Sequence, residues 1–266
     1  MKVVLITGAS SGIGKSIGEF LHHKGFVVYG TSRNPAKISN SIFPLMALDV
    51  RNVDSIRKAV ADVILITGRI DVVINNAGVG ITGPLEEIPT VEIKNNFETN
   101  FFGPIEVMKA VLPQMRLQKA GLIINITSIA AYMGLPYRSV YSASKGALEL
   151  ITEALRMEVK SFGIYITNVA PGDFATNIAA GRYHAPVIKG SDYEIPYGNT
   201  LATMDSHVDS GSNPIQMAEA IYHIIQNPKP RIHYKVGIFM QKFSIVLKRI
   251  LPDSVYEKML MNHYKL

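Results

Sequence analysis

The sequence predicts an α/β fold, a doubly wound parallel sheet of about seven strands flanked by helices on both faces. Short apolar runs alternate with longer amphipathic stretches along most of the 266 residues. Strands that are apolar on both sides, each followed by a helical pattern, are typical of a sheet between two helical layers. No internal repeat interrupts this alternation. We therefore expect a single domain over residues 1–266.

The individual elements follow from the same alternation. The expected strands are Val3 to Thr7, Val27 to Ser32, Met46 to Val50, Val72 to Asn76, Leu122 to Ser128, Tyr165 to Ala170 and Ile232 to Val236. Helices are expected near residues 12–24, 53–67, 90–118, 139–162 and 214–226. Residues 177–213 lose the periodicity and predict an irregular substrate lid. Residues 238–266 are expected to form a C-terminal helical extension.

Composition excludes several classes of function. The chain has no cysteine, which excludes disulfides and thiolate metal sites, and we expect no metal. Its net charge of +6 is spread without a dense basic run, which disfavours nucleic-acid binding. No signal peptide precedes the first strand, and no apolar run reaches the roughly 18 residues of a membrane span. We expect a soluble, cytoplasmic protein.

A glycine-rich turn follows the first strand. Gly8, Gly12 and Gly14 lie where this strand passes into a helical pattern. Without side chains they let the backbone approach a pyrophosphate, whose charge the helix N-terminus attracts. The alternative is a glycine-rich loop without a ligand. The turn predicts a dinucleotide cofactor.

The ends of the next strands indicate which dinucleotide is bound. Ser32 and Arg33 end the second strand, and a guanidinium there favours the extra phosphate of NADP(H) over NAD. A solvated loop arginine is the alternative. Asp49 is expected to accept a hydrogen bond from the adenine amino group, or else to cap the following helix. Small residues in Asn76 to Gly78 would let the cofactor lie against the backbone.

The spacing of Tyr141 and Lys145 predicts the chemistry. Residues four apart share one face of a helix, and an ammonium beside a phenol is expected to lower the pKa of the phenol. Tyr141 would then exchange a proton with a substrate oxygen. Ser128 ends a strand at the same edge of the sheet, so its hydroxyl is expected to meet that oxygen. Taken alone, a Tyr–Lys pair at this spacing is commonly structural.

Together these motifs resemble the short-chain dehydrogenase/reductase family, which has a Rossmann-like fold. The resemblance rests on Thr-Gly-x-x-x-Gly-x-Gly, Asn-Asn-Ala-Gly, a strand-end serine and Tyr-x-x-x-Lys in this order, over roughly residues 1–176. It implies that Ser128 polarises the substrate oxygen and that Tyr141 exchanges the proton. Lys145 would bind the nicotinamide ribose, and Asn100 would hold a water that extends a proton relay. Asn100 as a helix-bending amide is the alternative.

The resemblance also implies that Thr176 hydrogen-bonds the nicotinamide carboxamide. The cofactor-binding residues predicted in all are Gly8, Ser10, Ser11, Gly12, Ile13, Gly14, Ser32, Arg33, Asp49, Val50, Asn76, Ala77, Gly78, Tyr141, Lys145, Pro171, Gly172 and Thr176. The catalytic residues are Ser128, Tyr141, Lys145 and Asn100. The expected activity is NADP(H)-dependent interconversion of a ketone and a secondary alcohol.

The variable part of the chain suggests the substrate and the partners. A lipophilic ketone, steroid-like, retinoid-like or long-chain, is favoured, because the tail loosely resembles members related to 17β-hydroxysteroid and retinol dehydrogenases. The alternatives are a 3-ketoacyl group on a carrier protein or coenzyme A, 3-ketosphinganine, or a non-catalytic cofactor sensor. Pocket-lining candidates are Tyr183, His184, Tyr193 and Tyr197.

The tail and two long helices bear on assembly. The tail could be an amphipathic helix on a membrane surface or against a lipophilic pocket, or a helix packed on its own domain or a partner subunit. We favour packing, because the apolar face is interrupted and the net charge is small. By analogy with the family, a homodimer or homotetramer is expected to form through residues 104–118 and 139–162.

Overall fold

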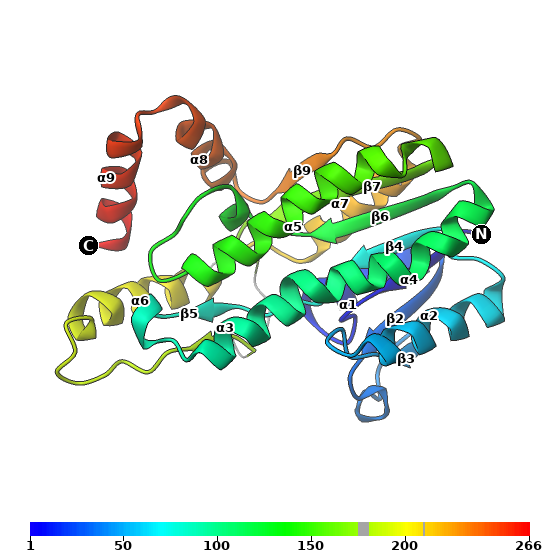
Figure 1. Cartoon of the computed structure of the whole chain (residues 1–266), viewed down its shortest axis with the longest axis horizontal. Helices are drawn as coiled ribbons and strands as arrows, with labels where there is room; N and C mark the ends of the chain where they lie inside the picture. Colours follow the sequence, from blue (N-terminus) through cyan, green and yellow to red (C-terminus); the bar gives the residue numbers. More distant parts are fainter. Residues whose placement is uncertain (175–180, 210) are drawn as a thin grey trace.

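The computed structural model describes residues 1–174, 181–209 and 211–266, with the backbone alone for residues 205–209. Its centre is a parallel sheet of seven strands in the order β3-β2-β1-β4-β6-β7-β9 (Figure 1), which confirms the predicted fold class. The strands are β1 (Val3–Ile6), β2 (Val27–Ser32), β3 (Leu45–Ala47), β4 (Val72–Asn75), β6 (Gly121–Ile126), β7 (Ile164–Pro171) and β9 (His233–Val236). The order reverses between β1 and β4, which leaves a crevice at their carboxyl ends.

Helices cover both faces of the sheet (Figure 1). The helices that the structure describes are α1 (Gly12–His23), α2 (Val53–Thr67), α3 (Thr90–Phe97), α4 (Gly103–Gln118), α5 (Ser139–Glu158), α6 (Glu194–Asp209), α7 (Ile215–Gln226), α8 (Phe239–Ile250) and α9 (Asp253–Tyr264). Of these, α2, α4 and α5 pack on one face of the sheet, and α1 and α7 pack on the other. In the part of the chain that the structure describes, no helix is long and apolar enough to span a bilayer.

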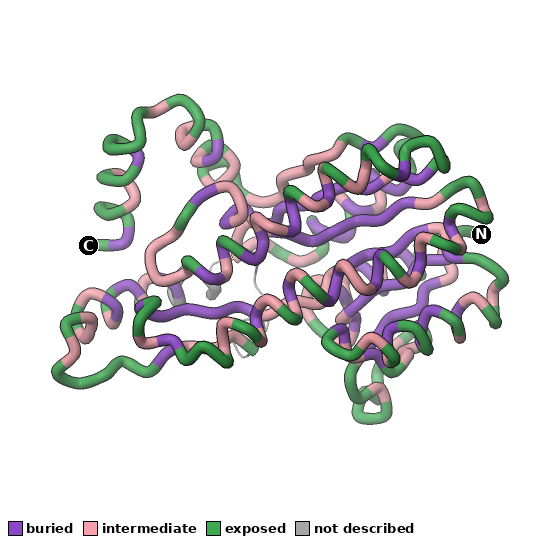
Figure 2. Tube along the Cα trace, viewed as in Figure 1, coloured by how far each residue is buried: buried purple, intermediate pink, exposed green. Residues whose placement is uncertain are grey.

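Two apolar clusters hold the layers together. Val3 and Leu5 of β1 face the layer of α2, α4 and α5, whereas Val4 and Ile6 face the layer of α1 and α7. This alternation is that of a strand covered on both sides. All four side chains are 4% exposed or less, and Figure 2 shows the strands as buried through the middle of the sheet. The sheet is therefore a rigid platform for the residues at its edges.

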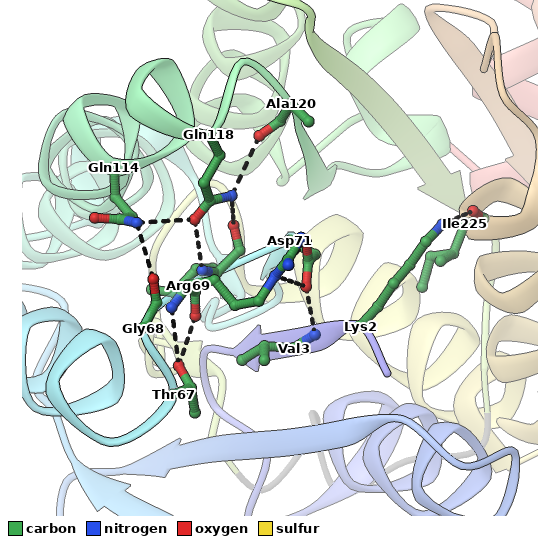
Figure 3. Close-up of polar contacts among 11 residues, drawn as sticks. Lys2, Val3, Thr67, Gly68, Arg69, Asp71, Gln114, Gln118, Ala120 and Ile225 are labelled. Carbon is green, nitrogen blue, oxygen red and sulfur yellow. Dashed lines mark hydrogen bonds and ion pairs between the residues drawn. The ribbon is translucent and has the colours of Figure 1, made fainter.

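The amino edge of the sheet is closed by polar contacts (Figure 3). Asp71, just before β4, accepts a hydrogen bond from the Val3 backbone N–H at 2.8 Å. The Gln118 side chain accepts from the Ile70 N–H at 3.0 Å and donates to the Ile70 carbonyl at 2.9 Å. These contacts join β1, β4 and the end of α4. This edge serves stability, and the crevice lies at the opposite edge.

The long helix predicted over residues 90–118 is interrupted. Between α3 and α4 the backbone forms a π-helical segment, η3 (Glu98–Phe102), which contains Asn100. Such segments are frequent at functional sites because the extra residue re-aims a side chain. Sequence periodicity does not reveal one additional residue in a turn, so the prediction of one continuous helix was wrong.

The lid contains structure that was not predicted, whereas the tail is helical as expected. Within residues 177–213, β8 (Tyr183–His184) pairs with β5 (Ile81–Thr82), and α6 follows. The start of α6 holds Pro196 and Gly198, which disfavour helices, although proline is tolerated in a first turn. The tail forms two helices, α8 and α9, separated at Pro252.

Candidate active site

A strained turn connects β1 to α1. Gly8 and Gly12 have φ angles of +65° and +54°, a region that favours glycine. A Cβ on Gly8 would lie 3.0 Å from the Ala77 Cα. The turn therefore needs glycine at both positions, and the N-terminus of α1 opens toward the crevice.

Asn76 ties this turn to the loop after β4. Its side-chain amide donates to the carbonyl oxygens of Thr7 at 2.9 Å and Gly8 at 3.0 Å. In return, the Thr7 hydroxyl accepts from the backbone N–H groups of Asn76 and Ala77, both at 3.0 Å. The two loops thus form one unit. Gly14 makes room for it, because a Cβ there would lie 2.4 Å from Asn76 Nδ2 and 2.5 Å from the Gly8 carbonyl oxygen.

A cavity of about 640 Å³ occupies the crevice. The predicted cofactor residues that line it are Gly8, Ser10, Ser11, Gly12, Ile13, Ser32, Arg33, Asp49, Val50, Asn76, Ala77, Gly78, Tyr141, Lys145 and Pro171. Gly14 is not among the lining residues, since its place is behind Asn76. Gly172 lines a second, smaller cavity, and Thr176 lies outside the described residues. A cavity floored by glycines at a helix N-terminus fits a dinucleotide.

Cations gather at the end of the cavity near β2. Arg33 is exposed and lines the cavity together with Ser32 and Lys37. Sequence analysis missed Lys37, although its place five residues after the strand end was a readable signal. Hydrogen bonding to Arg51 lowers the pKa of Asp49, whose two oxygens accept from the guanidinium at 3.0 and 3.3 Å.

Asp49 does not cap α2. The cap is Asn52, whose side-chain oxygen accepts from the Ser55 backbone N–H at 3.0 Å. The alternative of a capping role for Asp49 was therefore wrong. Asp49 instead lines the cavity and pairs with Arg51.

Tyr141 lies where the two cavities meet, because it lines both. It stands in the first turn of α5, and Ser128 follows the end of β6. Burial raises the pKa of Tyr141, while a hydrogen bond with Ser128 and the positive charges of Arg138 and Arg182 oppose that rise. We expected the Lys145 ammonium to lower this pKa. The structure contradicts that expectation, since burial outweighs the groups that favour the phenolate.

Lys145 is 5% exposed and lines the large cavity. Its Nζ donates to the Ile126 carbonyl at 2.9 Å. Burial lowers the pKa of Lys145 to about 8, and the negative charge of Glu149 opposes that shift. A Cβ on Gly78 would lie 3.3 Å from Nζ. The Lys145 Nζ therefore lies in a tight, polar corner of the cavity.

Asn100 is fully buried beside this corner. Its amide donates to the Val79 carbonyl and accepts from the Val79 N–H, both at 2.8 Å. Its Nδ2 also lies 3.3 Å from the Ser144 hydroxyl. Asn100 thus joins the loop after β4 to α5.

Glu149 is a buried acid that sequence analysis missed. It is 5% exposed and stands one helical turn after Lys145. Its carboxylate accepts from Thr127 at 2.5 Å and from Tyr132 at 3.0 Å, and lies 2.8 Å from His233 Nδ1. The four-residue spacing from Lys145 was visible, but the partners come from distant segments. They fix a negative charge behind the lysine.

The smaller cavity, of about 80 Å³, lies on the other side of Tyr141. Ser128, Arg138, Gly172, Asp173 and Arg182 line it, together with others. Gln241 of α8 reaches its wall, donating to an Asp173 carboxylate oxygen at 2.7 Å and accepting from the Asp173 N–H at 3.2 Å. The tail therefore takes part in this end of the site.

The four lid residues predicted to line the substrate pocket have different surroundings in the structure. Tyr183 lines the large cavity. His184 Nδ1 lies 3.1 Å from the Thr82 hydroxyl, within the small β5–β8 sheet. Tyr197 is fully buried and donates to the Ala185 carbonyl at 3.0 Å, and Tyr193 packs beside it. Tyr197 is thus a core residue of the lid.

Known proteins are similar to this chain in sequence. The short chain dehydrogenase family model matches residues 2–186. Over 264 residues the chain is 40% identical to a 3-ketodihydrosphingosine reductase of Bacteroides thetaiotaomicron, covering 99% of this chain and 98% of that protein. It is 33% identical to human retinol dehydrogenase 8 over 258 residues, 89% of this chain and 82% of that one.

Solved structures have a similar fold. A short-chain dehydrogenase from Streptomyces avermitilis matches with a TM-score of 0.86 at 31% identity, over 99% of this chain and 96% of that one. An alcohol dehydrogenase from the archaeon Thermococcus sibiricus, complexed with 5-hydroxy-NADP, matches with a TM-score of 0.71 at 25% identity, over 90% and 96%.

The packing at Gly14 gives a test of the cofactor loop. We expect Gly14→Ala to lower the free energy of unfolding by about 1–3 kcal/mol, because the new Cβ would press on Asn76 and on backbone. Urea unfolding measures the change. Gly134→Ala is the matched control, since nothing lies within 4 Å of a Cβ there. Equal stability of the two variants would contradict the packing described.

Proposed function

Because the chain belongs to the short-chain dehydrogenase family, we propose that it uses NADP(H) to reduce a lipophilic, long-chain ketone to a secondary alcohol. The chain is an oxidoreductase that acts on CH–OH groups with a nicotinamide cofactor. The observation that carries the proposal is that Ser128, after β6, meets Tyr141 and Lys145 of α5 around two adjoining cavities.

The large cavity provides the cofactor site. Backbone of the turn at Gly8 to Gly12 would hold the pyrophosphate, and Lys145 would hold the nicotinamide ribose. The chemistry that reduced nicotinamide supplies when bound is a hydride for the carbonyl carbon. The small cavity provides the substrate end, beside Tyr141 and Ser128.

Tyr141 supplies the proton. Since burial raises its pKa, the phenol keeps its proton at neutral pH and acts as a donor. The phenol O–H bond breaks as the alcohol O–H bond forms, while the Ser128 hydroxyl donates a hydrogen bond to the same oxygen. Lys145, with a pKa of about 8, is suited to return a proton to the phenolate.

The proposed substrate class rests on the relatives. The 40% identity to a 3-ketodihydrosphingosine reductase extends over nearly the whole of both chains, and the retinol dehydrogenase likeness also concerns a lipophilic substrate. This supports a long-chain 3-ketone above a steroid-like one or a 3-ketoacyl group. The proton relay through Asn100, the Thr176 contact and the cytoplasmic location stay predictions.

We also propose a homo-oligomer built through α4 and α5. Leu117 on α4 and Leu150 and Met157 on α5 are 81%, 68% and 73% exposed. Large apolar side chains in this number on two neighbouring helices support an interface between subunits.

Removing the phenol hydroxyl tests the mechanism. We expect Tyr141→Phe to lower kcat at least about a hundredfold, because no group then donates the proton. NADPH oxidation with a long-chain 3-ketone measures turnover, and cofactor fluorescence measures binding, which should persist. Tyr222→Phe on α7, distant from both cavities, is the control. A Tyr141→Phe variant with normal turnover would refute the assignment, whereas a parent chain that oxidises no NADPH with any ketone would favour the non-catalytic sensor.

The cations near β2 test the choice of cofactor. We expect Arg33→Ala with Lys37→Ala to raise KM for NADPH about tenfold or more, because the extra phosphate loses both partners, with little change for NADH. Steady-state kinetics with each cofactor provides the comparison, and NADH serves as the internal control. Equal effects on both cofactors would show that these residues do not select the phosphate.

The effect of Glu149 on the pKa of Lys145 can be tested through the pH dependence of kcat/KM. The Lys145 ammonium is present below about pH 8 and is lost above it, so kcat/KM should decline as pH rises through that value. Glu149→Gln removes the charge that favours the ammonium, which lowers the pKa of Lys145 further and moves the decline to lower pH. Glu153→Gln, at the half-exposed partner of His233, is the control. An unmoved decline in Glu149→Gln would contradict this coupling.

A further inference from the structure

The outer face of α8 carries a stripe of apolar side chains. Phe239, Phe243, Val246 and Ile250 have exposed fractions of 70%, 37%, 39% and 73%. Their spacing of four, three and four residues places them on one side of the helix. The rings of Phe239 and Phe243 stack with their centroids 5.5 Å apart. These four residues, the α8 stripe, therefore share one side of the helix, and the expectation of an interrupted apolar face was wrong for this segment.

The opposite face of α8 fixes the rotation of the helix. Ile245 is 1% exposed and packs with Met133 and Tyr256. On the same inner face, Gln241 holds Asp173 at the smaller cavity. The inner face is thus partly polar, while the outer face is apolar. A helix that served only its own domain would show the reverse arrangement.

Cations accompany the α8 stripe. Lys242, Lys248 and Arg249 are the charged residues of α8, which has no acidic residue. Lys248 pairs with Asp253 at 2.6 Å. Within the described ranges, Lys242 and Arg249 form no ion pair, and seven-residue spacing places both along the same edge of the stripe. Figures 1 and 2 show α8 at the outside of the molecule, away from the helices that cover the sheet.

We propose that the α8 stripe, with Lys242 and Arg249, docks on the surface of an anionic lipid bilayer. Apolar side chains would enter the headgroup region while the two cations meet lipid phosphates. A helix of 12 residues is too short to span the bilayer and would lie along it. Because Gln241 lies on the same helix, docking would bring the smaller cavity near the lipid. The inference holds whichever ketone is reduced.

Vesicle sedimentation with the full chain tests the proposal. We expect binding to vesicles of phosphatidylcholine and phosphatidylglycerol in equal parts, weaker binding to phosphatidylcholine alone, and loss of the difference at high salt. Phe239→Ser with Phe243→Ser should weaken binding about tenfold or more to both vesicles. Lys242→Gln with Arg249→Gln should weaken binding to the anionic vesicles only.

The control is Leu65→Ser with Ile66→Ser, which removes two apolar side chains of α2 that are 86% and 62% exposed. It should bind vesicles as the parent chain does. Thermal unfolding of every variant confirms folding, and because sedimentation needs no turnover, its result is separate from that of the proposed reaction.

Light scattering tests the alternative that the α8 stripe binds a second copy of the chain. Should the Phe239→Ser and Phe243→Ser pair split an oligomer while no variant binds vesicles, the stripe is a subunit interface and the proposal is overturned. Vesicle binding that is unchanged by this pair would overturn it equally.

Discussion

The site depends on the hydrogen bonds that hold two loops together at the point where the strand order reverses. Thr7 and Asn76 exchange four hydrogen bonds between the turn after β1 and the loop after β4, counting those to Gly8 and Ala77. Neighbouring parallel strands with helices on opposite faces diverge at their carboxyl ends. These bonds set how far the loops separate, and with it the width of the large cavity. They leave backbone N–H groups at the start of α1 free to face an anion.

A second constraint acts on the face of α5 that carries Tyr141 and Lys145. Lys145 and Glu149 lie one turn apart on a buried helix face, and the acid is held by Thr127, Tyr132 and His233. Burial would by itself favour a neutral lysine, and the fixed carboxylate moderates that tendency. Burial likewise favours the neutral form of Tyr141, which raises the pKa of its phenol. Helix α5 thus carries a phenol with a raised pKa one turn before an amine whose pKa is lowered to about 8.

Sequence alone predicted what depends on local spacing. The glycine turn, the Tyr141–Lys145 spacing and the strand ends could be located because each follows a strand or a helix with a clear period. The pKa of Tyr141 could not be predicted, because the burial of its phenol and its hydrogen bond with Ser128 depend on how separate segments pack. Glu149 was missed for the same reason. The π-helical turn at Asn100 and helix α6, which has Pro196 in its first turn, were missed because neither follows a regular period.

The contact between Gln241 and Asp173 has a consequence for the order in which the protein is made. Every residue that lines the large cavity precedes α6 in the chain. The wall of the smaller cavity is braced by α8. Helix α9 touches the lid, because the Tyr264 carbonyl accepts a hydrogen bond from Thr200 at 3.3 Å. A ribosome that has translated α7 has translated all the described strands but β9. Every residue that lines the large cavity is therefore synthesised before the helix that braces the smaller cavity.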